Sequence, residues 1–345
     1  MNEASGDGKA PPALSVVIVA YNSAASLPAC VAALAAQTFA DFELIVVDNA
    51  SPQGEAAPVA AAHPFARLVP AGANLGFAGG VNLGARSARG RWLVLLNPDA
   101  YPDPDWLEQL TAAAARHPKV RSFTSRQVMA HDRGLLDGLG DVMSAPAIPY
   151  RGGYLNPDPG DTPEGEVFSP CGAAMMVERA LFLELGGLDE SFFCYCEDVD
   201  FGYRLQLAGE PTLLVPEAVI AHEGSATSGG PKSEFAVFHG VRNRFWVLVK
   251  DTPALLLPLV LPLHLAAFAL ISLRPQNRDL LKVTARAFRA ALAGLPAQLR
   301  SRRKVQRRRT ASTLDIVRAL TWNPRDLSGR RPVIRPLRPS RRGGS

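Results

Sequence analysis

The feature that most constrains the fold is a series of short apolar runs, rich in β-branched residues, each followed by a polar break. The runs are Leu14 to Ala20, Phe42 to Val47 and Arg91 to Leu96. Such an uninterrupted run is typical of a strand that is buried on both faces of a parallel sheet. Segments with helical periodicity separate the runs, near 26–37, 55–62 and 79–88. The alternation predicts an α/β fold, in which helices flank a Rossmann-like, mostly parallel sheet.

Polar residues follow the runs where each strand is expected to end. Asn22 follows the first run, Asp48 and Asn49 follow the second, and Asn97 and Asp99 follow the third. In doubly wound sheets, ligands bind outside the carboxyl ends of the strands. We therefore expect one crevice to hold Asn22, Asp48 and Asp99. A turn-forming role is the competing interpretation of Asp48, Asn49 and Asp99.

The carboxylate of Asp99 also suits a divalent cation. Mg²⁺ is usually held by one or two carboxylates, with substrate phosphates and water completing its shell. A metal held in this way would stabilise the departure of a diphosphate leaving group. His222 follows another strand-like segment, and a lone histidine is more often structural than a ligand. Cys194 and Cys196 lack a second pair at zinc spacing, so they predict no metal site.

A second group of carboxylates opens a helix that is expected to start at Glu197. Glu197 and Asp198 follow the aromatic stretch Phe192–Tyr195. A carboxylate beside an aromatic wall and a helix N-terminus is a candidate general base. Asp200 and Arg204 are spaced i, i+4, and this spacing predicts a surface ion pair rather than part of a site.

Charge is divided unevenly along the 345 residues. Residues 251–345 hold 20 Lys and Arg against 4 Asp and Glu, a net charge of +16, whereas residues 1–250 hold 17 against 28, a net of −11. The basic part is expected to meet an anionic surface. Four cysteines cannot form a disulfide framework, so a reducing compartment is expected. The polar residues 1–12 predict a flexible tail without a secretory signal.

The C-terminal part has two features of a membrane-associated segment. Residues 254–273 carry no formal charge and are just long enough to cross a bilayer, although Pro258, Pro262 and His264 argue against a plain spanning helix. Residues 278–309 then follow the pattern of a basic amphipathic helix lying at a membrane interface. RNA binding by the arginine-rich segment is an alternative, but base-stacking aromatic residues are absent from 301–320, and no nucleic-acid partner is expected.

Several motifs occur together in an order that resembles the family-two inverting glycosyltransferases, most closely their rhamnosyltransferase-like branch. They span residues 14–250, nearly the whole acidic part. The motifs are VVIVAYNSAASLPACVAAL (16–34), ELIVVDNASPQG (43–54), NLGFAGGVNLG (74–84), RWLVLLNPDA (91–100), CGAAMMVER (171–179), GGLDESFFCYCEDVDFGYRLQLAG (186–209) and VPEAVIAHEGSATSGG (215–230).

The resemblance implies a GT-A fold and a role for each matching residue. On the donor side, Asn22 and Asp48 would contact the nucleoside and the loop around Asn74 would line the pocket. The donor-binding residues implied are Asn22, Asp48, Asn49, Asn74, Gly76 and Asn97. Asp99 matches the metal-binding Asp of the DxD motif, in which many members have an Asp at the position of Asn97. His222 matches a position that completes the metal shell in some relatives.

On the acceptor side, Asp198 matches the catalytic base, and Glu197 beside it would position the acceptor. The implied reaction is a single inverting displacement with Mg²⁺ or Mn²⁺ as cofactor. The favoured donor is dTDP-L-rhamnose, and the acceptor is a lipid-linked, polyprenyl-linked or cell-surface glycan, as in cell wall or polysaccharide biosynthesis. The enzyme would act at the cytoplasmic face of the inner membrane as a peripheral or monotopic protein.

The predicted domains follow from the same motifs and from the charge division. They are a flexible tail (1–12), a GT-A glycosyltransferase domain (13–250), membrane-associating helices (251–310) and a basic C-terminal tail (311–345). Two alternatives remain open. One is a UDP-galactofuranosyl- or other hexosyltransferase of the same fold, and the other is a noncatalytic, nucleotide-sugar-binding or membrane-scaffolding protein.

Overall fold

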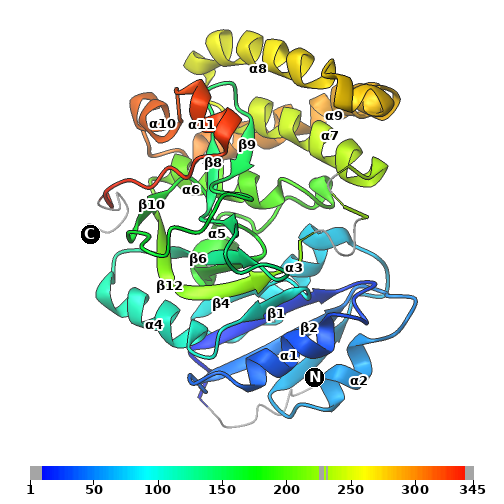
Figure 1. The fold of residues 1–345 in the computed structure, drawn as a ribbon, viewed down its shortest axis with the longest axis vertical. Coiled ribbons are helices and arrows are strands. Elements are labelled where there is room, and N and C mark those ends of the chain that lie inside the picture. The colour runs from blue at the N-terminus through cyan, green and yellow to red at the C-terminus, as the bar shows by residue number, and fades with distance from the viewer. Residues whose placement is uncertain (1–9, 225–228, 231, 339–345) are drawn as a thin grey trace, which may run out of the picture.

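A ten-stranded mixed sheet forms the middle of the molecule in the computed structural model, which describes residues 10–224, 229–230 and 232–338 (Figure 1). The main strand order is β10-β12-β6-β11-β4-β1-β2-β3, while β5 pairs with β12, β7 pairs with β6, and β8 and β9 form a separate hairpin. The strands are β1 (Leu14–Ala20), β2 (Phe42–Asp48), β3 (Ala66–Pro70), β4 (Trp92–Leu96), β5 (Ala100–Pro102), β6 (Ser122–Met129), β7 (Leu136–Gly138), β8 (Asp141–Met143), β9 (Pro149–Arg151), β10 (Gly165–Val167), β11 (Ala174–Glu178) and β12 (Thr212–His222).

Helices cover both faces of the sheet and continue into a separate layer above it (Figure 1). The helices of the sheet layers are α1 (Leu27–Ala35), α2 (Ala56–Ala61), α3 (Gly76–Ser87), α4 (Trp106–Arg116), α5 (Arg179–Glu184), η1 (Glu190–Phe192) and α6 (Glu197–Ala208). The later helices are α7 (Glu234–Asp251), η2 (Ala254–Leu256), α8 (Leu257–Ser272), η3 (Pro275–Leu280), α9 (Leu281–Arg307), α10 (Thr313–Ala319) and α11 (Pro324–Gly329).

The parallel strands β1 to β4 confirm the α/β fold expected from the apolar runs. β1 pairs in parallel with both β2 and β4, and β2 pairs in parallel with β3. Alternate residues of β1 enter opposite layers: Val16 packs with α1, α2 and α4, whereas Val17 packs with α3, α5 and α6. Burial on both faces explains why the runs lack the polar alternation of a half-exposed strand.

The region of weak pattern between residues 120 and 170 forms the other half of the sheet. β11 runs antiparallel between β4 and β6, and β12 pairs in parallel with β6. β12 is one continuous strand, in which a register shift between Val215 and Val219 separates the two apolar stretches. After the shift, β12 continues to His222, which lies at the same edge of the sheet as the end of β4.

The C-terminal helices form the upper layer of Figure 1, with α7 packed between α6 and α9. Phe245, Trp246 and Leu248 of α7 share a hydrophobic cluster with Ala291 of α9 and Ile316 of α10. The predicted domain boundary at residue 250 lies at the C-terminal end of α7. This helix packs against α6, which precedes the boundary, and against α9, which follows it. Helices α10 and α11 lie within the predicted basic tail, while residues 1–9 and 339–345 lie outside the described residues.

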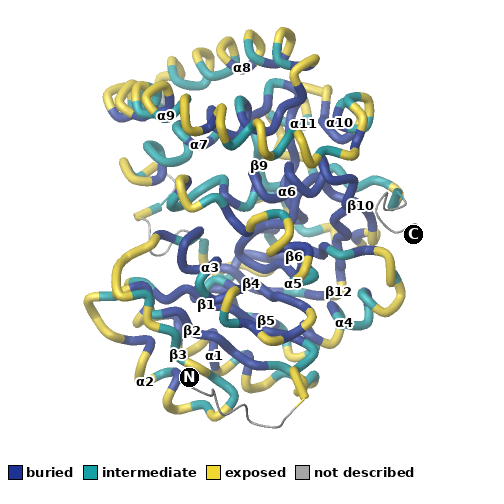
Figure 2. The backbone as a smooth tube through the Cα atoms, turned by 180° about the vertical axis from the view of Figure 1, so that it is seen from behind, coloured by how far each residue is buried: buried dark blue, intermediate teal, exposed yellow. Residues whose placement is uncertain are grey.

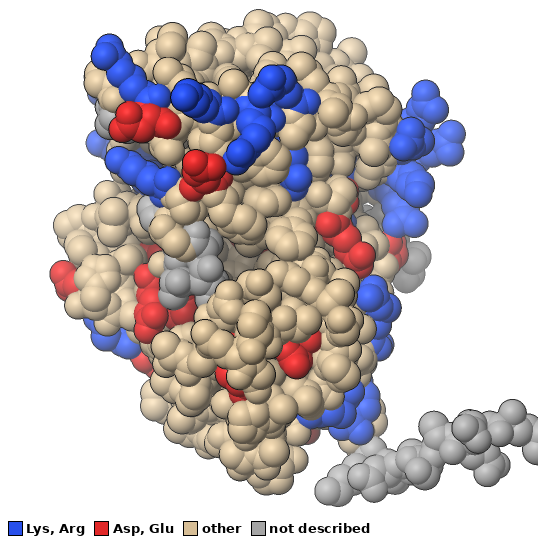
Figure 3. All heavy atoms as spheres, turned by 90° about the vertical axis from the view of Figure 1, so that its right-hand side faces the viewer, with Lys and Arg blue, Asp and Glu red and all other residues tan. Residues whose placement is uncertain are grey.

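Helix α8 lies along the outer edge of this layer and is largely exposed (Figure 2). Ala254–Ser272 is long and apolar enough to cross a membrane, with a mean hydropathy of 2.4 and only 17% of its most apolar window buried. It stays helical through Pro262. Figure 3 shows Lys and Arg side chains on the same upper part of the molecule.

Candidate active site

A cavity of about 720 Å³ opens at the carboxyl ends of β1, β2 and β4, where a doubly wound sheet binds its ligands. It continues beneath the N-terminus of α6 and the end of β12. Most of the residues predicted from the sequence as site residues border this one cavity. They are Asn49, Asn74, Gly76, Asn97, Asp99, Glu197, Asp198 and His222.

Asn22 and Asp48 lie at the expected strand ends but are not among the residues that line the cavity. The backbone N–H of Asn22 donates to Ser51 Oγ, and Asp48 Oδ1 accepts from the N–H of Ser51. Both residues thus help to shape the turn after β2, as the competing interpretation of Asp48 proposed. Their predicted contacts with the nucleoside remain a prediction.

Asn49 and Asn74 form a rigid polar corner on the sheet side of the cavity. Asn49 Nδ2 donates to Asn74 Oδ1 at 3.1 Å and to the carbonyl of Gly76 at 3.2 Å. Gly76 has a φ of +69°, and a Cβ there would lie 2.3 Å from the carbonyl oxygen of Phe193. Only glycine allows this approach, so the glycine-rich motif brings the Asn corner against the segment that precedes Asp198.

Asp99 and His222 meet at the floor of the cavity. The distance from Asp99 Oδ1 to His222 Nε2 is 3.3 Å, and His222 Nδ1 lies 2.8 Å from Asp137 Oδ2. Burial alone would lower the pKa of His222, but Asp137 and Asp99 raise it to about 9, so the ring would have to lose the proton on Nε2 to bind a cation there. A carboxylate behind a ring nitrogen is the usual way to orient a metal-binding histidine.

These residues fit a divalent cation that shares its shell with a substrate. Within residues 10–224, 229–230 and 232–338, no three His, Cys, Asp or Glu side chains converge to hold a metal alone. However, Asn97 Oδ1 is buried without a hydrogen-bond partner, and its amide nitrogen lies 3.5 Å from His222 Nε2. Asp99, His222 and this orphaned oxygen would offer three ligands, and diphosphate and water would supply the rest.

Asp198 is held by backbone groups at the start of α6. The N–H of Gly172 donates to its Oδ2 at 3.0 Å, and the N–H of Val199 donates to its Oδ1 at 2.8 Å. A Cβ at Gly172 would lie 3.1 Å from both Cβ and Oδ2 of Asp198, so the two segments are in close contact. Oriented in this way and half-buried in the cavity wall, the carboxylate is placed to accept a proton.

Two further carboxyl groups flank Asp198. Burial, and then the charge of Asp198, raise the pKa of Glu197 and of Asp141 well above the ordinary range. Both groups line the cavity, and the raised pKa favours the protonated form of each, which can donate a hydrogen bond. The sequence pattern did not reveal Asp141, nor did it reveal Arg151, which lines the cavity and pairs with Asp137. Both residues lie in the weakly patterned region, where no local signal marks them.

The segment that precedes Asp198 has a strained backbone. Phe193, Tyr195 and Cys196 have φ values of 65°, 70° and 66°, in the left-handed region that non-glycine residues rarely adopt. Each such residue costs roughly 1–3 kcal/mol and persists only where the surroundings enforce it. All three line the cavity, so the strain is located at the site.

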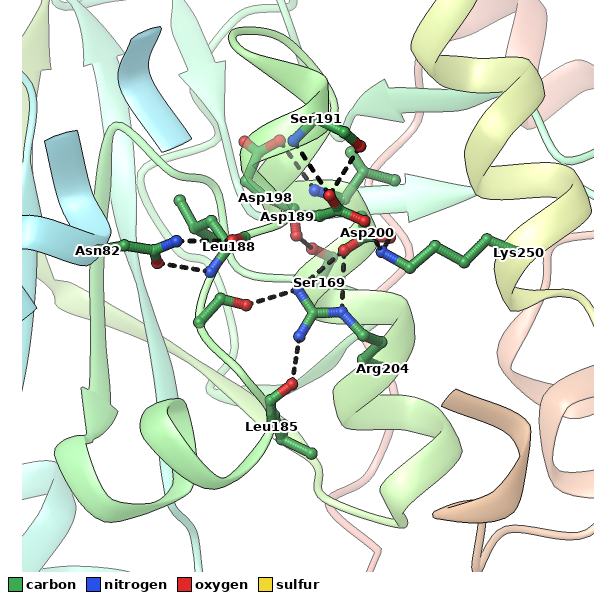
Figure 4. Close-up of polar contacts among 12 residues, drawn as sticks. Asn82, Ser169, Leu185, Leu188, Asp189, Ser191, Asp198, Asp200, Arg204 and Lys250 are labelled. Carbon is green, nitrogen blue, oxygen red and sulfur yellow. Dashed lines mark hydrogen bonds and ion pairs between the residues drawn. The ribbon is translucent and has the colours of Figure 1, made fainter. Parts of the chain in front are cut away.

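The prediction of a surface ion pair between Asp200 and Arg204 is wrong. Their side chains are 0% and 7% exposed, and Arg204 Nε donates to Asp200 Oδ2 at 2.8 Å (Figure 4). The i, i+4 spacing predicts the contact correctly but says nothing of which side of the helix is covered. Here α7 covers that side, and Lys250 of α7 lies 2.6 Å from the other oxygen of Asp200.

The chain is similar in sequence to known glycosyltransferases. The chain is 30% identical to the N-acetylglucosaminyl-diphospho-decaprenol L-rhamnosyltransferase of Mycobacterium tuberculosis over 255 residues, which are 66% of this chain and 81% of that protein. It is 24% identical to a hexosyltransferase of low-salt glycan biosynthesis from Haloferax volcanii, covering 67% of this chain and 74% of the relative.

Solved structures show the same fold. A mannosyltransferase from Pyrobaculum calidifontis in complex with GDP-Man and Mn²⁺ superposes with a TM-score of 0.51 at 18% identity, covering 90% of this chain and 86% of that one. TarS from S. aureus (residues 1–349) gives a TM-score of 0.53 at 16% identity, covering 85% and 90%. The family described as Glycosyl transferase family 2 matches residues 15–184. Together with the 30% identity to a rhamnosyltransferase, this match shows that the chain is a glycosyltransferase and belongs to family 2.

Proposed function

We propose that this glycosyltransferase moves L-rhamnose from dTDP-L-rhamnose to a lipid-linked glycan, with inversion at the anomeric carbon. The observation that carries this proposal is that Asp99 and Asp198, 99 positions apart in the chain, border one cavity. The relative from Mycobacterium tuberculosis, which is named as a rhamnosyltransferase acting on a decaprenol-linked substrate, supports the choice of donor and acceptor.

The proposed chemistry is a single displacement. An acceptor hydroxyl loses its proton to Asp198, whose orientation is fixed by Gly172 and Val199. The hydroxyl oxygen then forms a bond to the anomeric carbon, while the bond from that carbon to the diphosphate oxygen breaks and its electron pair leaves with the diphosphate. One base and no enzyme nucleophile are required, and attack from the opposite face inverts the configuration. Glu197 and Asp141 would donate hydrogen bonds to the acceptor.

A divalent cation, Mg²⁺ or Mn²⁺, would be held by Asp99 and His222, with Asn97 Oδ1 nearby. When bound, it would neutralise charge on the departing diphosphate. Asn49 and Asn74 would face the rest of the donor, while Asn22 and Asp48 would act from the edge of its nucleoside site.

We further propose that α8 and α9 hold the enzyme on the anionic cytoplasmic surface of the inner membrane, where polyprenyl-linked acceptors would be presented. Leu259, Leu263 and Leu270 of α8 are 49%, 40% and 72% exposed. Replacing Leu259 and Leu263 by Glu should reduce co-sedimentation with phosphatidylglycerol vesicles at least about tenfold. Leu155 and Leu183, 50% and 40% exposed elsewhere, are the matched control: their replacement by Glu should leave binding unchanged. Equal loss in both variants would contradict the proposal.

The proposed reaction is tested with a panel of nucleotide sugars and a short-chain polyprenyl diphosphate glycan, with Mg²⁺ or Mn²⁺ present. We expect transfer from dTDP-L-rhamnose and a product of inverted configuration by NMR. Transfer from a UDP-hexose or UDP-galactofuranose alone would favour the alternative of a hexosyl- or galactofuranosyltransferase of the same fold. A chain that binds nucleotide sugars but transfers none would favour a noncatalytic role.

A further inference from the structure

The strained turn before Asp198 is held by a helix that lies outside the matched family region. This turn, Phe193–Cys196, contains three non-glycine residues in the left-handed region and lines the cavity. The family match ends at residue 184, and α7 begins 50 positions later. The turn belongs to the motif of residues 186–209, whereas α7 begins after the last of the motifs, which ends at residue 230.

Asn243 of α7 is fully buried and faces the carbonyl groups of the turn. Its Nδ2 lies 3.0 Å from the carbonyl oxygen of Phe192, 2.9 Å from that of Cys194 and 2.7 Å from that of Tyr195. An amide nitrogen carries two hydrogens, so three carbonyls converge on two donors. For three nearby carbonyl groups to point at one amide, the backbone must turn tightly around it. The positive φ values of this segment produce such a turn.

The amide of Asn243 is itself oriented by its neighbour. Arg242 Nε donates to Asn243 Oδ1 at 2.8 Å, and this bond assigns the oxygen and nitrogen of the amide. Arg242 Nη2 also donates to the carbonyl of Phe192 at 2.8 Å. Two adjacent residues of α7 therefore donate hydrogen bonds to the same segment of backbone.

A buried ionic cluster fixes α7 against the segments on either side of the turn (Figure 4). Lys250 Nζ lies 2.6 Å from both Asp189 Oδ2, before the turn, and Asp200 Oδ1, after it. Arg204 then joins Asp200 to the carbonyls of Leu185 and Gly187. With both ends of the turn fixed to one helix, the amide of Asn243 has a constant position relative to Asp198.

We propose that Asn243 is a positioning residue, which holds the turn Phe193–Cys196 and thereby sets the place of Asp198 in the cavity. The effect of Asn243 on catalysis rests on the proposed function, whereas its effect on the conformation of the turn does not. This role also makes α7 part of the active site, in addition to its packing against α9. The proposed class of reaction is unchanged. What is added is that the position of Asp198 depends on Asn243.

Asn82 provides a matched control for Asn243. It is also a buried amide, and it holds the same loop from α3 through the N–H and carbonyl of Leu188, ahead of the turn (Figure 4). Asn82→Ala and Asn243→Ala each remove one buried amide, so both are expected to lower stability. Only Asn243→Ala should disturb the turn, and Asn243→Ser, which keeps one donor, should have an intermediate effect.

Two cysteines in the turn give a readout that requires no sugar transfer. Burial raises the pKa of Cys194 and Cys196, which makes both thiols poor nucleophiles in the intact turn. Alkylation by iodoacetamide, located by mass spectrometry, should become at least about tenfold faster at these two cysteines in Asn243→Ala and remain unchanged in Asn82→Ala. Cys30, buried in the sheet core, serves as the internal reference for global unfolding.

Kinetics complete the test. In Asn243→Ala, kcat should fall about 10- to 100-fold with little change in the donor KM, because a displaced base affects the chemical step. Asn82→Ala should keep kcat within about threefold for its folded fraction. Unchanged alkylation in Asn243→Ala, or equal kcat losses in both variants, would overturn the inference. Faster alkylation at the turn with no transfer by any variant or by the wild type would overturn the proposed function alone.

A second inference concerns a basic pocket at the start of the exposed apolar segment. A cavity of about 490 Å³ lies between η2 and the second half of α9, with Ala254, Leu255 and Leu299 on its apolar side. Its polar side consists of Arg302, Arg303, Arg309 and Gln306. Arg302 and Gln306 donate to carbonyls at the end of α7, whereas Arg303 is exposed and Arg309 Nη1 lies 3.5 Å from Thr313 Oγ1.

We infer that this pocket binds the headgroup of an anionic phospholipid, with Arg303 and Arg309 facing the phosphate. Leu255, 80% exposed at its rim, would contact the acyl region beside α8. This inference rests on the proposed membrane association and adds a specific binding site to it. Guanidinium groups are suited to phosphate oxygens because they donate two parallel hydrogen bonds.

The test compares two pairs of substitutions at the C-terminal end of α9 and just after it. Arg303→Gln with Arg309→Gln removes two of the three pocket arginines, while Lys304→Gln with Arg307→Gln removes as many charges outside the pocket. Binding to phosphatidylglycerol vesicles should fall at least about tenfold more in the first variant than in the second. Equal losses would mean that charge acts diffusely and would overturn the inference. Inorganic phosphate competing at millimolar concentration would assign the site to free phosphate and equally overturn it.

Discussion

The buried position of Lys250 gives the sharpest prediction of stability. Its side chain is 2% exposed and contacts Asp189 and Asp200, each at 2.6 Å. Burial lowers the pKa of Lys250, but the nearby Asp200 reverses this and raises it, so the amine is charged. Lys250→Met keeps most of the length of the side chain and removes only the charge. The change therefore tests the ion pairs rather than packing.

The two carboxylates are expected to respond differently. Asp189 has a 20% exposed side chain and can be solvated by water when Lys250 is lost. Asp200 is 0% exposed and would keep Arg204 as its cationic partner, beside the buried carboxyl group of Asp251. Breaking a buried pair on one side typically costs about 3–5 kcal/mol, because a charge stays buried without full compensation. We expect a loss in this range from the free energy of unfolding, which is a large part of the total for an ordinary domain.

Urea denaturation followed by tryptophan fluorescence measures this loss. The control is Arg286→Met, which removes a pair with Glu234 at 3.2 Å whose side chains are 57% and 76% exposed. An exposed pair contributes about 0–1 kcal/mol, so this variant should unfold close to the wild type. Costs within about 1 kcal/mol of each other for the two variants would refute the reasoning, because burial would then make no difference.

Three further predictions concern the charges and contacts around the site. Burial and then the charge of Asp200 raise the pKa of Asp251 well above its ordinary value, so its ionisation costs stability as the pH rises from about 4 through the raised pKa. Asp251→Asn should lose this dependence, so in urea titrations the wild type should lose stability relative to the variant as the pH rises above about 4. Gly172→Ala places a Cβ 3.1 Å from Asp198 Oδ2, and the resulting shift of the base should lower kcat about tenfold at unchanged donor affinity; unaltered kcat would contradict the close contact. Asp99→Asn should raise the Mn²⁺ concentration for half-maximal transfer at least about tenfold, and an unchanged requirement would remove Asp99 from the metal site.

The amino-acid sequence predicted those features best that depend on residues close together in the chain. The buried runs predicted β1, β2 and β4 because burial on both faces leaves a local apolar signature. Residues that follow strands in a parallel sheet are brought to one edge by topology, so the order of the runs was enough to place Asp99 at the cavity. Asn22 and Asp48, which were expected in the same crevice, lie at the strand ends but do not line it. Asp198 could be placed from its position at a helix start.

Features that depend on distant packing could not be predicted from the sequence. Asp200 and Arg204 were assigned to the surface, because no local pattern reveals that α7 covers them. Asn243 lies in an amphipathic helix without a motif, and its role depends on three carbonyls about 50 positions earlier in the chain. Asp141 belongs to a short strand in a region where regular periodicity is absent.

Substitution of the proposed base tests the central claim most directly. Asp198→Asn retains the size of the side chain and removes its ability to accept the proton of an acceptor hydroxyl. With dTDP-L-rhamnose and a polyprenyl-linked acceptor, we predict that kcat falls by about 10³-fold while the donor still raises the melting temperature as it does for the wild type. Transfer within about tenfold of the wild type would contradict the account, because another group would then remove the proton.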